Sequence, residues 1–143
     1  MSDGSATGAP AFPDHPALEQ IVGIGTDLLQ ESRIQDALGR HGERFVRRIL
    51  TPQEQQIYLQ RRQSVNFIAK QYAAKEALAK ALGTGIAKGV GFQQLEILRD
   101  GSGAPQVKLH GAAADLLRNL GGQHAFVSLS DDGGLIQAFA VLV

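Results

Sequence analysis

A long segment with no polar face, residues 65–82, constrains the fold of this chain more than any other feature. Drawn as an α-helix at about 100° per residue, it carries apolar side chains nearly all round, with Ile68 and Tyr72 on one side and Phe67 on the other. A helix of this kind is buried by other elements. Glu76 lies within the segment. Because burying an unpaired carboxylate is costly, we expect a cation or a bound proton to accompany Glu76.

Two kinds of cation could accompany Glu76. Lys80 follows four residues later, in the order that favours an ion pair, and such a pair stabilises a helix by roughly 0.2–0.5 kcal/mol. The alternative is a divalent metal, which needs a second carboxylate. Asp27 is the best candidate because it ends the hydrophobic, glycine-containing segment 21–27, although an acid there is also commonly a turn or helix N-cap residue. Asp27 and Glu76 would give Mg²⁺ hard oxygen ligands and leave positions open for water and substrate phosphates.

The composition excludes several kinds of site. By length the 143 residues form one domain, and the absence of cysteine excludes disulfides, thiolate nucleophiles and cysteine-ligated metals. The histidines are scattered without metal-ligand spacing. No apolar stretch is long enough to span a membrane, and residues 1–20 lack the basic start and apolar core of a secretory signal. We therefore expect a disordered N-terminal extension over 1–20, a single domain over 21–143, and a cytoplasmic protein.

Arginines are concentrated in the first half of the chain, although the formal net charge is zero. They are Arg33, Arg40, Arg44, Arg47, Arg48, Arg61 and Arg62. A solvated helical face is the more frequent explanation of such a run. Nucleic-acid binding fits poorly, because few aromatic residues are interleaved and the chain as a whole is not basic. An acidic protein partner fits better, since the guanidinium group suits bidentate contact with carboxylates.

Strands and helices are predicted from periodicity and from start and stop signals. The predicted strands are 21–27, 92–99, 106–109, 125–130 and 135–143, and the predicted helices are 32–39, 43–50, 52–61, 65–82 and 112–120. Ser32 is the expected cap of the first helix, and Thr51 with Glu54 predicts a capping box for the third. Residues 100–103 and 131–134 predict hairpin turns. The order indicates an α+β domain in which an antiparallel sheet packs on a long central helix.

The common nucleotide and hydrolase motifs are absent from the sequence. Leu28 stands where a dinucleotide fingerprint has its third glycine, the loop 83–91 lacks a P-loop ending, and no Gly-x-Ser-x-Gly elbow occurs. Three other motifs follow one another: Gly-Ile-Gly-Thr-Asp at 23–27, Tyr-Ala-Ala-Lys-Glu-Ala-x-x-Lys-Ala-x-Gly-Thr-Gly at 72–85, and Val-Ser-Leu-Ser at 127–130. In this order they resemble the holo-[acyl-carrier-protein] synthase family, the small bacterial 4′-phosphopantetheinyl transferases. The resemblance extends from about residue 21 to residue 143, and the first two motifs together are highly specific.

The resemblance implies an activity and a magnesium site. The family moves the phosphopantetheine arm of coenzyme A onto a serine of apo-acyl carrier protein, releases adenosine 3′,5′-bisphosphate, and so supports fatty acid biosynthesis. By match to the family's acidic motifs, Asp27 and Glu76 would hold Mg²⁺ against the pyrophosphate, and either Glu76 or a metal-bound water would take the serine proton. Lys80 would contact the phosphates and neutralise the leaving group, with Lys75 as a further phosphate contact. The Gly83-Thr84-Gly85 loop would let the backbone approach the nucleotide closely.

The resemblance also implies partners. Arg33 and Arg44 match positions that meet the acidic carrier protein in relatives, and Arg48 shares the helix face of Arg44. Relatives form homotrimers with coenzyme A bound between subunits. Many of them have a histidine where this chain has Asp131, so the role of that histidine is not carried over. Two alternatives remain: a regulator that binds coenzyme A or a nucleotide without transferring anything, and an adaptor that uses only the arginines and leaves Glu76 unexplained. Neither nucleic acid nor a membrane is an expected partner.

Overall fold

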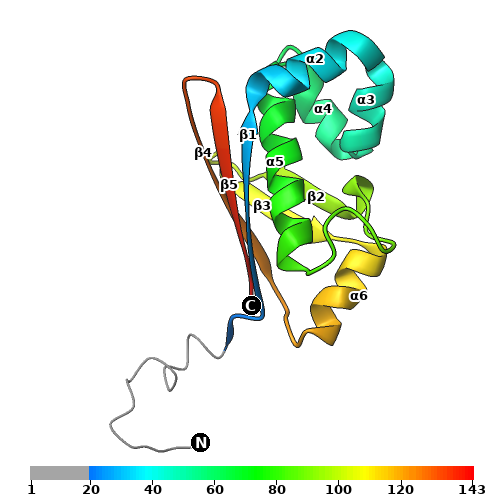
Figure 1. Cartoon of the computed structure of the whole chain (residues 1–143), viewed down its shortest axis with the longest axis vertical. Helices are drawn as coiled ribbons and strands as arrows, with labels where there is room; N and C mark the ends of the chain where they lie inside the picture. Colours follow the sequence, from blue (N-terminus) through cyan, green and yellow to red (C-terminus); the bar gives the residue numbers. More distant parts are fainter. Residues whose placement is uncertain (1–19) are drawn as a thin grey trace, which may run out of the picture.

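A three-stranded antiparallel sheet lies along one side of the long helix α5 (Figure 1). The structure is a computed structural model that describes residues 20–143, so the predicted extension over 1–20 lies, except for Gln20, outside the described residues. The sheet has the order β1-β5-β4, with β1 at Gly23–Gln30, β5 at Leu135–Leu142 and β4 at Ala125–Asp132. The predicted α+β class, an antiparallel sheet packed on a long helix, is confirmed.

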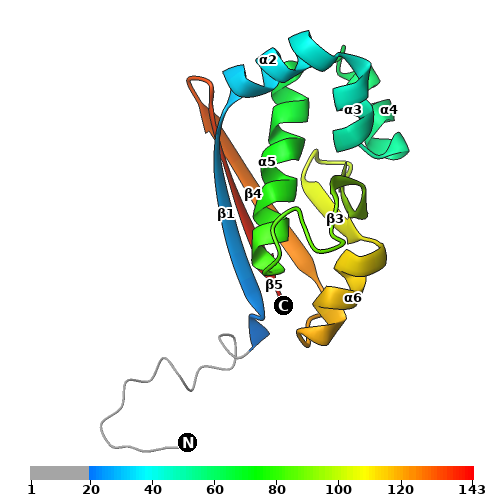
Figure 2. The ribbon, with the colours of Figure 1, turned by 45° about the vertical axis from the view of Figure 1, so that its right-hand side comes forward.

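Helix α5 (Val65–Ala81) is the centre of the hydrophobic core. Ser64 caps the helix, because its hydroxyl accepts a hydrogen bond from the backbone N–H of Phe67 at 3.2 Å. The sheet packs on one side of α5, and a separate hairpin of β2 (Leu95–Arg99) and β3 (Pro105–Leu109) lies on the other side (Figure 2). This burial from two sides explains why the sequence of α5 has no polar face.

Three short helices lie at the N-terminal end of α5 (Figure 2). They are α2 (Glu31–His41), α3 (Glu43–Ile49) and α4 (Pro52–Gln60), and two of them, α2 and α3, pack on α5. The capping box predicted for α4 is confirmed: the Thr51 hydroxyl accepts from the backbone N–H of Glu54 at 3.2 Å, and the Glu54 carboxylate accepts from the backbone N–H of Thr51 at 2.7 Å. The predicted cap of α2 is wrong. Ser32 lies inside this helix, which begins at Glu31 directly after β1 and has no side-chain cap.

Two further elements follow α5. The segment predicted as a strand from residue 92 begins instead as a short 3-10 helix, η2 (Phe92–Gln94), and β2 starts only at Leu95. Helix α6 (Gly111–Asn119) lies near the C-terminal end of α5 (Figure 1). Within residues 20–143, no helix has the length and apolar character needed to cross a membrane.

Two glycines of β1 bring this strand unusually close to α5. A Cβ atom placed at Gly25 would lie 2.2 Å from the carbonyl oxygen of Ala77, and one at Gly23 would lie 2.4 Å from the carbonyl oxygen of Ala81. These separations are far shorter than any van der Waals contact, so only glycine fits at either position. The close approach sets the distance between the side chains that β1 and α5 present to each other.

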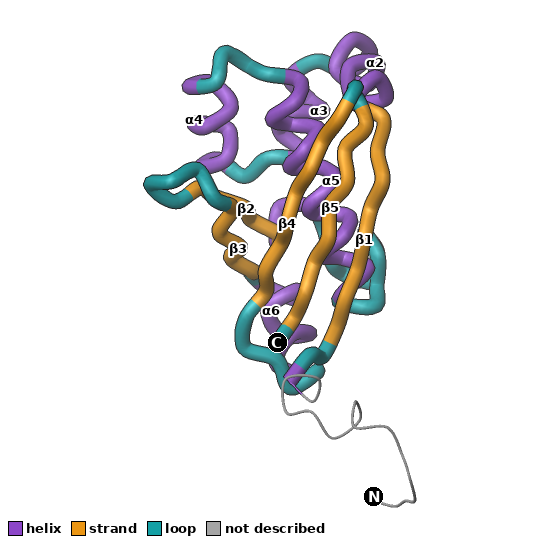
Figure 3. The backbone as a smooth tube through the Cα atoms, turned by 90° about the vertical axis from the view of Figure 1, so that its left-hand side faces the viewer, coloured by secondary structure: helices purple, strands orange, loops and turns teal. Residues whose placement is uncertain are grey.

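The face of the sheet that points away from α5 (Figure 3) carries several exposed large apolar side chains. Ile24 on β1 and Phe126 on β4 are both paired with Val141 of the central strand, so they lie in one row across the sheet. Ile24 is 61 % exposed, Leu28 63 % and Phe126 56 %. Exposed large apolar residues gathered on one face are typical of surfaces that bind other proteins.

Candidate active site

Asp27 on β1 and Glu76 on α5 lie close enough for the charge of one to act on the other. Asp27 is paired with Ala138 of β5 and lies on the face of the sheet that packs on the helix, with its side chain 15 % exposed. Burial raises the pKa of Glu76 above its usual range, and the negative charge of Asp27 raises this pKa further. Lys80 and Arg33 act in the opposite direction. The fold therefore brings together the two carboxylates that the sequence singled out, although like charges repel.

Lys80 connects α5 to β1. Its ammonium donates to Oδ1 of Asp27 at 3.2 Å and to the backbone carbonyl of Thr26 at 3.0 Å, and its side chain is 53 % exposed. In the described part of the chain, no ion pair joins Lys80 to Glu76. Lys80 therefore makes its direct ion pair with Asp27, and it acts on Glu76 only through its charge, which lowers the pKa of that carboxyl. Lys80 keeps donor capacity toward solvent at the edge of the carboxylate pair.

The carboxylate pair fits a hard divalent cation. Both side chains offer oxygen donors and both are partly buried. The raised pKa of Glu76 reflects burial first and then the charge of Asp27, and a cation between the two carboxylates would oppose both effects. Within residues 20–143, no further histidine or acidic side chain lies close enough to serve as a third protein ligand beside these two carboxylates. Mg²⁺ commonly binds in this manner, through one or two carboxylates together with waters and substrate phosphates.

Lys75 does not reach the surface, and the expectation that it contacts phosphate is corrected by the structure. Its side chain is fully buried. Its ammonium donates to Oε1 of Glu54 at 2.6 Å and to the carbonyl oxygens of Ile49 at 2.6 Å and Phe92 at 3.0 Å. These three acceptors use all three N–H groups, so none remains for a ligand. Sequence alone could not show this, because the partners come from three other elements.

The loop predicted to approach a nucleotide begins where α5 ends, one turn beyond Lys80. The N–H groups of Thr84 and Gly85 donate to the carbonyl of Ala79 at 3.2 and 3.0 Å, which satisfies the end of the helix. Gly83 has φ 88° and Gly85 has φ 63°, a left-handed backbone that favours glycine. The loop is therefore placed beside Lys80.

The predicted carrier-binding arginines lie on α2 and α3, and all three are exposed. Arg33 is close enough to Glu76 to lower its pKa, and the guanidinium carbon of Arg48 lies 5.9 Å from the centre of the Phe92 ring. Arg44 lies one turn before Arg48 on α3.

The structure adds a cavity between α2, α3 and α5 that sequence reasoning missed. Its volume is about 330 Å³, and its lining includes Arg33, Ile34, Phe45 and Tyr72. Burial raises the pKa of Tyr72, and the charge of Glu76 raises it further, so the cavity adjoins the carboxylate pair. Tyr72 belongs to the same motif as Glu76 and was a signal available in the sequence.

Asp131 joins the β4–β5 hairpin to the start of α5. Its carboxylate accepts from Lys70 at 3.2 Å and from the side-chain amide of Asn66 at 3.1 Å. The same amide donates to Glu31 at the start of α2, at 2.9 Å. The lysine and the asparagine hold the pKa of Asp131 below its usual range. In this chain the residue connects elements through an exposed ion pair.

Comparison with known proteins gives one consistent result. A family model described as "ACPS: 4′-phosphopantetheinyl transferase superfamily" matches residues 23–135. The chain is similar to the holo-[acyl-carrier-protein] synthase of Shewanella frigidimarina, with 48% identity over 122 residues that cover 85% of this chain and 97% of the relative. It is also 49% identical over 112 residues to the synthase of Yersinia pestis, covering 78% of this chain and 89% of the relative.

Solved structures agree with these relatives. The crystal structure of the synthase from Neisseria meningitidis matches with a TM-score of 0.80 and 39% identity, covering 86% of this chain and 98% of that one. The Helicobacter pylori synthase in complex with coenzyme A matches with a TM-score of 0.74 and 30% identity, covering 84% of this chain and 99% of that one.

Proposed function

Because this chain belongs to the 4′-phosphopantetheinyl transferase superfamily, we propose that it transfers the 4′-phosphopantetheine group of coenzyme A to a serine of apo-acyl carrier protein. The transfer gives the holo-carrier and adenosine 3′,5′-bisphosphate, in support of fatty acid biosynthesis. The single observation that carries the proposal is the packing of β1 on α5, which places Asp27, Glu76 and Lys80 near one another and beside the loop at Gly83.

The carboxylate pair would hold Mg²⁺, and the metal would supply positive charge against the pyrophosphate of coenzyme A. Either Glu76 or a water held by the metal would accept the serine proton. The serine oxygen forms the new bond to phosphorus, its proton passes to that base, and the bond to the leaving bisphosphate breaks. Lys80, which is exposed beside Asp27, neutralises charge on the leaving group. The loop from Gly83 to Gly85 would lie along the nucleotide.

The arginines of α2 and α3 would bind the carrier. Carrier proteins are acidic around the modified serine, and Arg33, Arg44 and Arg48 form an exposed basic surface next to the carboxylate pair. The cavity lined by Phe45 and Tyr72 lies within this surface and offers apolar contact. The carrier would therefore meet the enzyme where its serine can reach the pyrophosphate.

We also propose that copies of this chain associate as a homotrimer through the outer face of the sheet. Ile24, Leu28, Phe126 and Phe139 leave that face apolar, and burying it would remove a large apolar area from water. Light scattering should give the mass of three chains, whereas Phe139→Glu should shift it toward one. A cytoplasmic location, where both substrates would be met, remains part of the proposal.

Mass spectrometry tests the activity. Apo-carrier incubated with the chain, coenzyme A and Mg²⁺ should gain the mass of one phosphopantetheine arm, and a carrier with alanine in place of the serine should not. Binding of coenzyme A without any mass gain would support the regulator and refute the transferase.

A further inference from the structure

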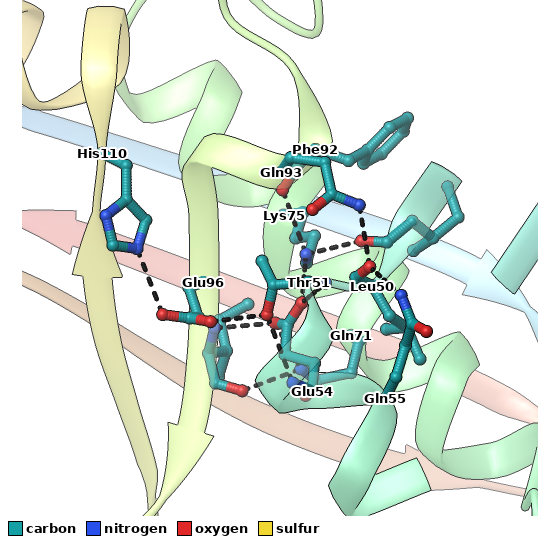
Figure 4. Close-up of polar contacts among 12 residues, drawn as sticks. Leu50, Thr51, Glu54, Gln55, Gln71, Lys75, Phe92, Gln93, Glu96 and His110 are labelled. Atoms are coloured by element: carbon teal, nitrogen blue, oxygen red, sulfur yellow. Dashed lines mark hydrogen bonds and ion pairs between the residues drawn. The ribbon is translucent and has the colours of Figure 1, made fainter. Parts of the chain in front are cut away.

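The last turn of α3 is held by side chains from three neighbouring elements. The carbonyl oxygen of Ile49 accepts from Lys75 of α5 at 2.6 Å, and that of Arg47 accepts from Gln93 of η2 at 2.7 Å. The carbonyl oxygen of Leu50 accepts from both Gln93 at 2.7 Å and Gln55 at 3.0 Å (Figure 4). The last carbonyl groups of a helix have no partner within it, so these contacts fix how α3 is oriented.

Lys75 is the charged and fully buried member of this set. Besides the carbonyl of Ile49, its ammonium contacts the carbonyl of Phe92, the first residue of η2, and the carboxylate of Glu54 (Figure 4). Lys75 directly precedes Glu76 on α5. One ammonium therefore joins α3, η2 and α4 to the helical turn that carries the candidate metal ligand.

Glu54 holds the Lys75 ammonium in place, because its own carboxylate is fixed by other contacts. Its Oε1 accepts from Thr51 at 2.7 Å and from Lys75, and its Oε2 accepts from Gln71 and the backbone N–H of Ile97, both at 2.8 Å. All lone-pair sites of the carboxylate are in use, so the position of the acid is set by α4, α5 and β2 together.

A buried ion pair is weak support for stability, since well-packed apolar residues of similar volume are often as stable. What this pair supplies is geometry: three acceptors around one ammonium. Aromatic rings pack the same region. The ring centre of Phe92 lies 5.3 Å from the ring centre of Tyr72 and 5.9 Å from the guanidinium carbon of Arg48. A displacement of α3 or η2 relative to α5 would therefore move Arg48 and the cavity of Tyr72 away from Glu76.

We propose that Lys75 is a positioning residue, whose ammonium sets the spacing between the carrier-binding helix α3 and the carboxylate pair of the active site. The proposal rests on the proposed function, because it assigns α3 to the carrier and Glu76 to the reaction. It predicts that loss of the ammonium weakens carrier recognition even in a folded enzyme.

The test uses the full chain and the double variant Lys75→Met/Glu54→Gln. Lys75→Met alone would leave Glu54 as an unpaired buried charge and unfold part of the population, whereas the double variant removes both charges at similar volume. Its matched control is His110→Ala, which removes a 3.1 Å contact to Glu96 in the same polar network but none to α3. Melting temperature, and kcat and KM for the carrier, are measured on all three proteins.

The double variant should fold, raise the KM for the carrier about tenfold and lower kcat/KM about a hundredfold, which is the loss expected from a misplacement of about 1 Å. His110→Ala should keep both constants within about twofold of the parent, because the contact that it removes lies outside those that hold α3. A structural role would only reduce the amount of folded enzyme, which lowers kcat but leaves the KM unchanged. A folded double variant with the parental KM would overturn the proposal, as would a double variant that does not fold, since the pair would then serve the whole fold. Absence of transfer by the parent chain would instead refute the proposed function.

Discussion

Gly25→Ala is a small change with a large expected effect, because β1 and α5 touch at this glycine. The added Cβ would lie 2.2 Å from the carbonyl oxygen of Ala77 and 2.7 Å from the backbone nitrogen of Ala81, where ordinary contact is 3.4–4 Å. Both clashing atoms are backbone, so a rotamer change cannot relieve the clash. The strand must move away from the helix by about 1 Å.

Overpacking of this kind lowers the free energy of unfolding by roughly 1–3 kcal/mol. For a chain of this length each kcal/mol lowers Tm by about 2–4 °C, so we expect Tm to fall by about 2–12 °C. The same displacement separates Asp27 on β1 from Glu76 on α5. Because a 1 Å misplacement can lower the rate by about a hundredfold, transfer should be lost well below the temperature at which the variant unfolds.

Calorimetry measures the loss of stability. Single-turnover transfer, measured about 20 °C below the Tm of the variant so that the protein stays folded, measures the loss of activity separately. Gly101→Ala is the matched control, because a Cβ at Gly101 meets nothing within 4 Å. The control should change stability by less than about 0.5 kcal/mol and leave transfer intact. A Gly25→Ala protein with parental Tm and parental transfer would refute the claim that the approach of β1 to α5 sets the site.

Three further predictions follow from charges. Glu76→Gln should abolish transfer and raise the Tm of the metal-free protein at pH 7, because the charged Glu76 carboxylate destabilises the folded state. Since the folded pKa of Glu76 is raised, calorimetry should show that this gain vanishes below the ordinary glutamate pKa of about 4.3. A gain in Tm that persists below that pH would show that it does not come from the Glu76 charge. Arg44→Ala should raise the KM for the carrier and flatten its salt dependence without changing coenzyme A affinity by titration, whereas Arg118→Ala on α6 should change neither; equal losses for both substrates would assign Arg44 to the fold. Burial alone would raise the pKa of Glu96, but hydrogen bonds from Thr51 and His110 outweigh burial and hold this pKa below its usual range. Urea unfolding should therefore show that the parent loses stability as the pH falls below about 4.3, and that Glu96→Gln loses less. Equal losses in the parent and in Glu96→Gln would show that the Glu96 carboxylate is not the cause.

Much of the fold could be predicted because its signals are local. The capping box at Thr51 needs only residues three apart, and the burial of α5 follows from the absence of a polar face along one segment. Asp27 could be proposed as the partner of Glu76 from its place at the end of a strand, but only the resemblance favoured this pairing, since nothing local to either residue indicates the other.

The remaining features depend on which elements pack together. The resemblance predicted that Lys75 contacts phosphate, yet its carboxylate partner Glu54 is 21 residues away and reaches it only once α4 lies against α5. The glycines of β1 look in the sequence like part of an incomplete dinucleotide fingerprint. The structure explains them by the backbone of α5, which packs against them although it lies several elements further along the chain. Such contacts carry no periodicity that a single sequence displays.

The central claim is that Asp27 and Glu76 together hold a divalent cation. Titration of Mn²⁺ as a probe, followed by electron paramagnetic resonance on the full chain with coenzyme A bound, measures this without any transfer. We expect one saturable site per chain, lost in Asp27→Asn and in Glu76→Gln alike, and retained in Asp131→Asn, whose carboxylate pairs with Lys70 instead. Parental Mn²⁺ affinity in either Asp27→Asn or Glu76→Gln would contradict the account.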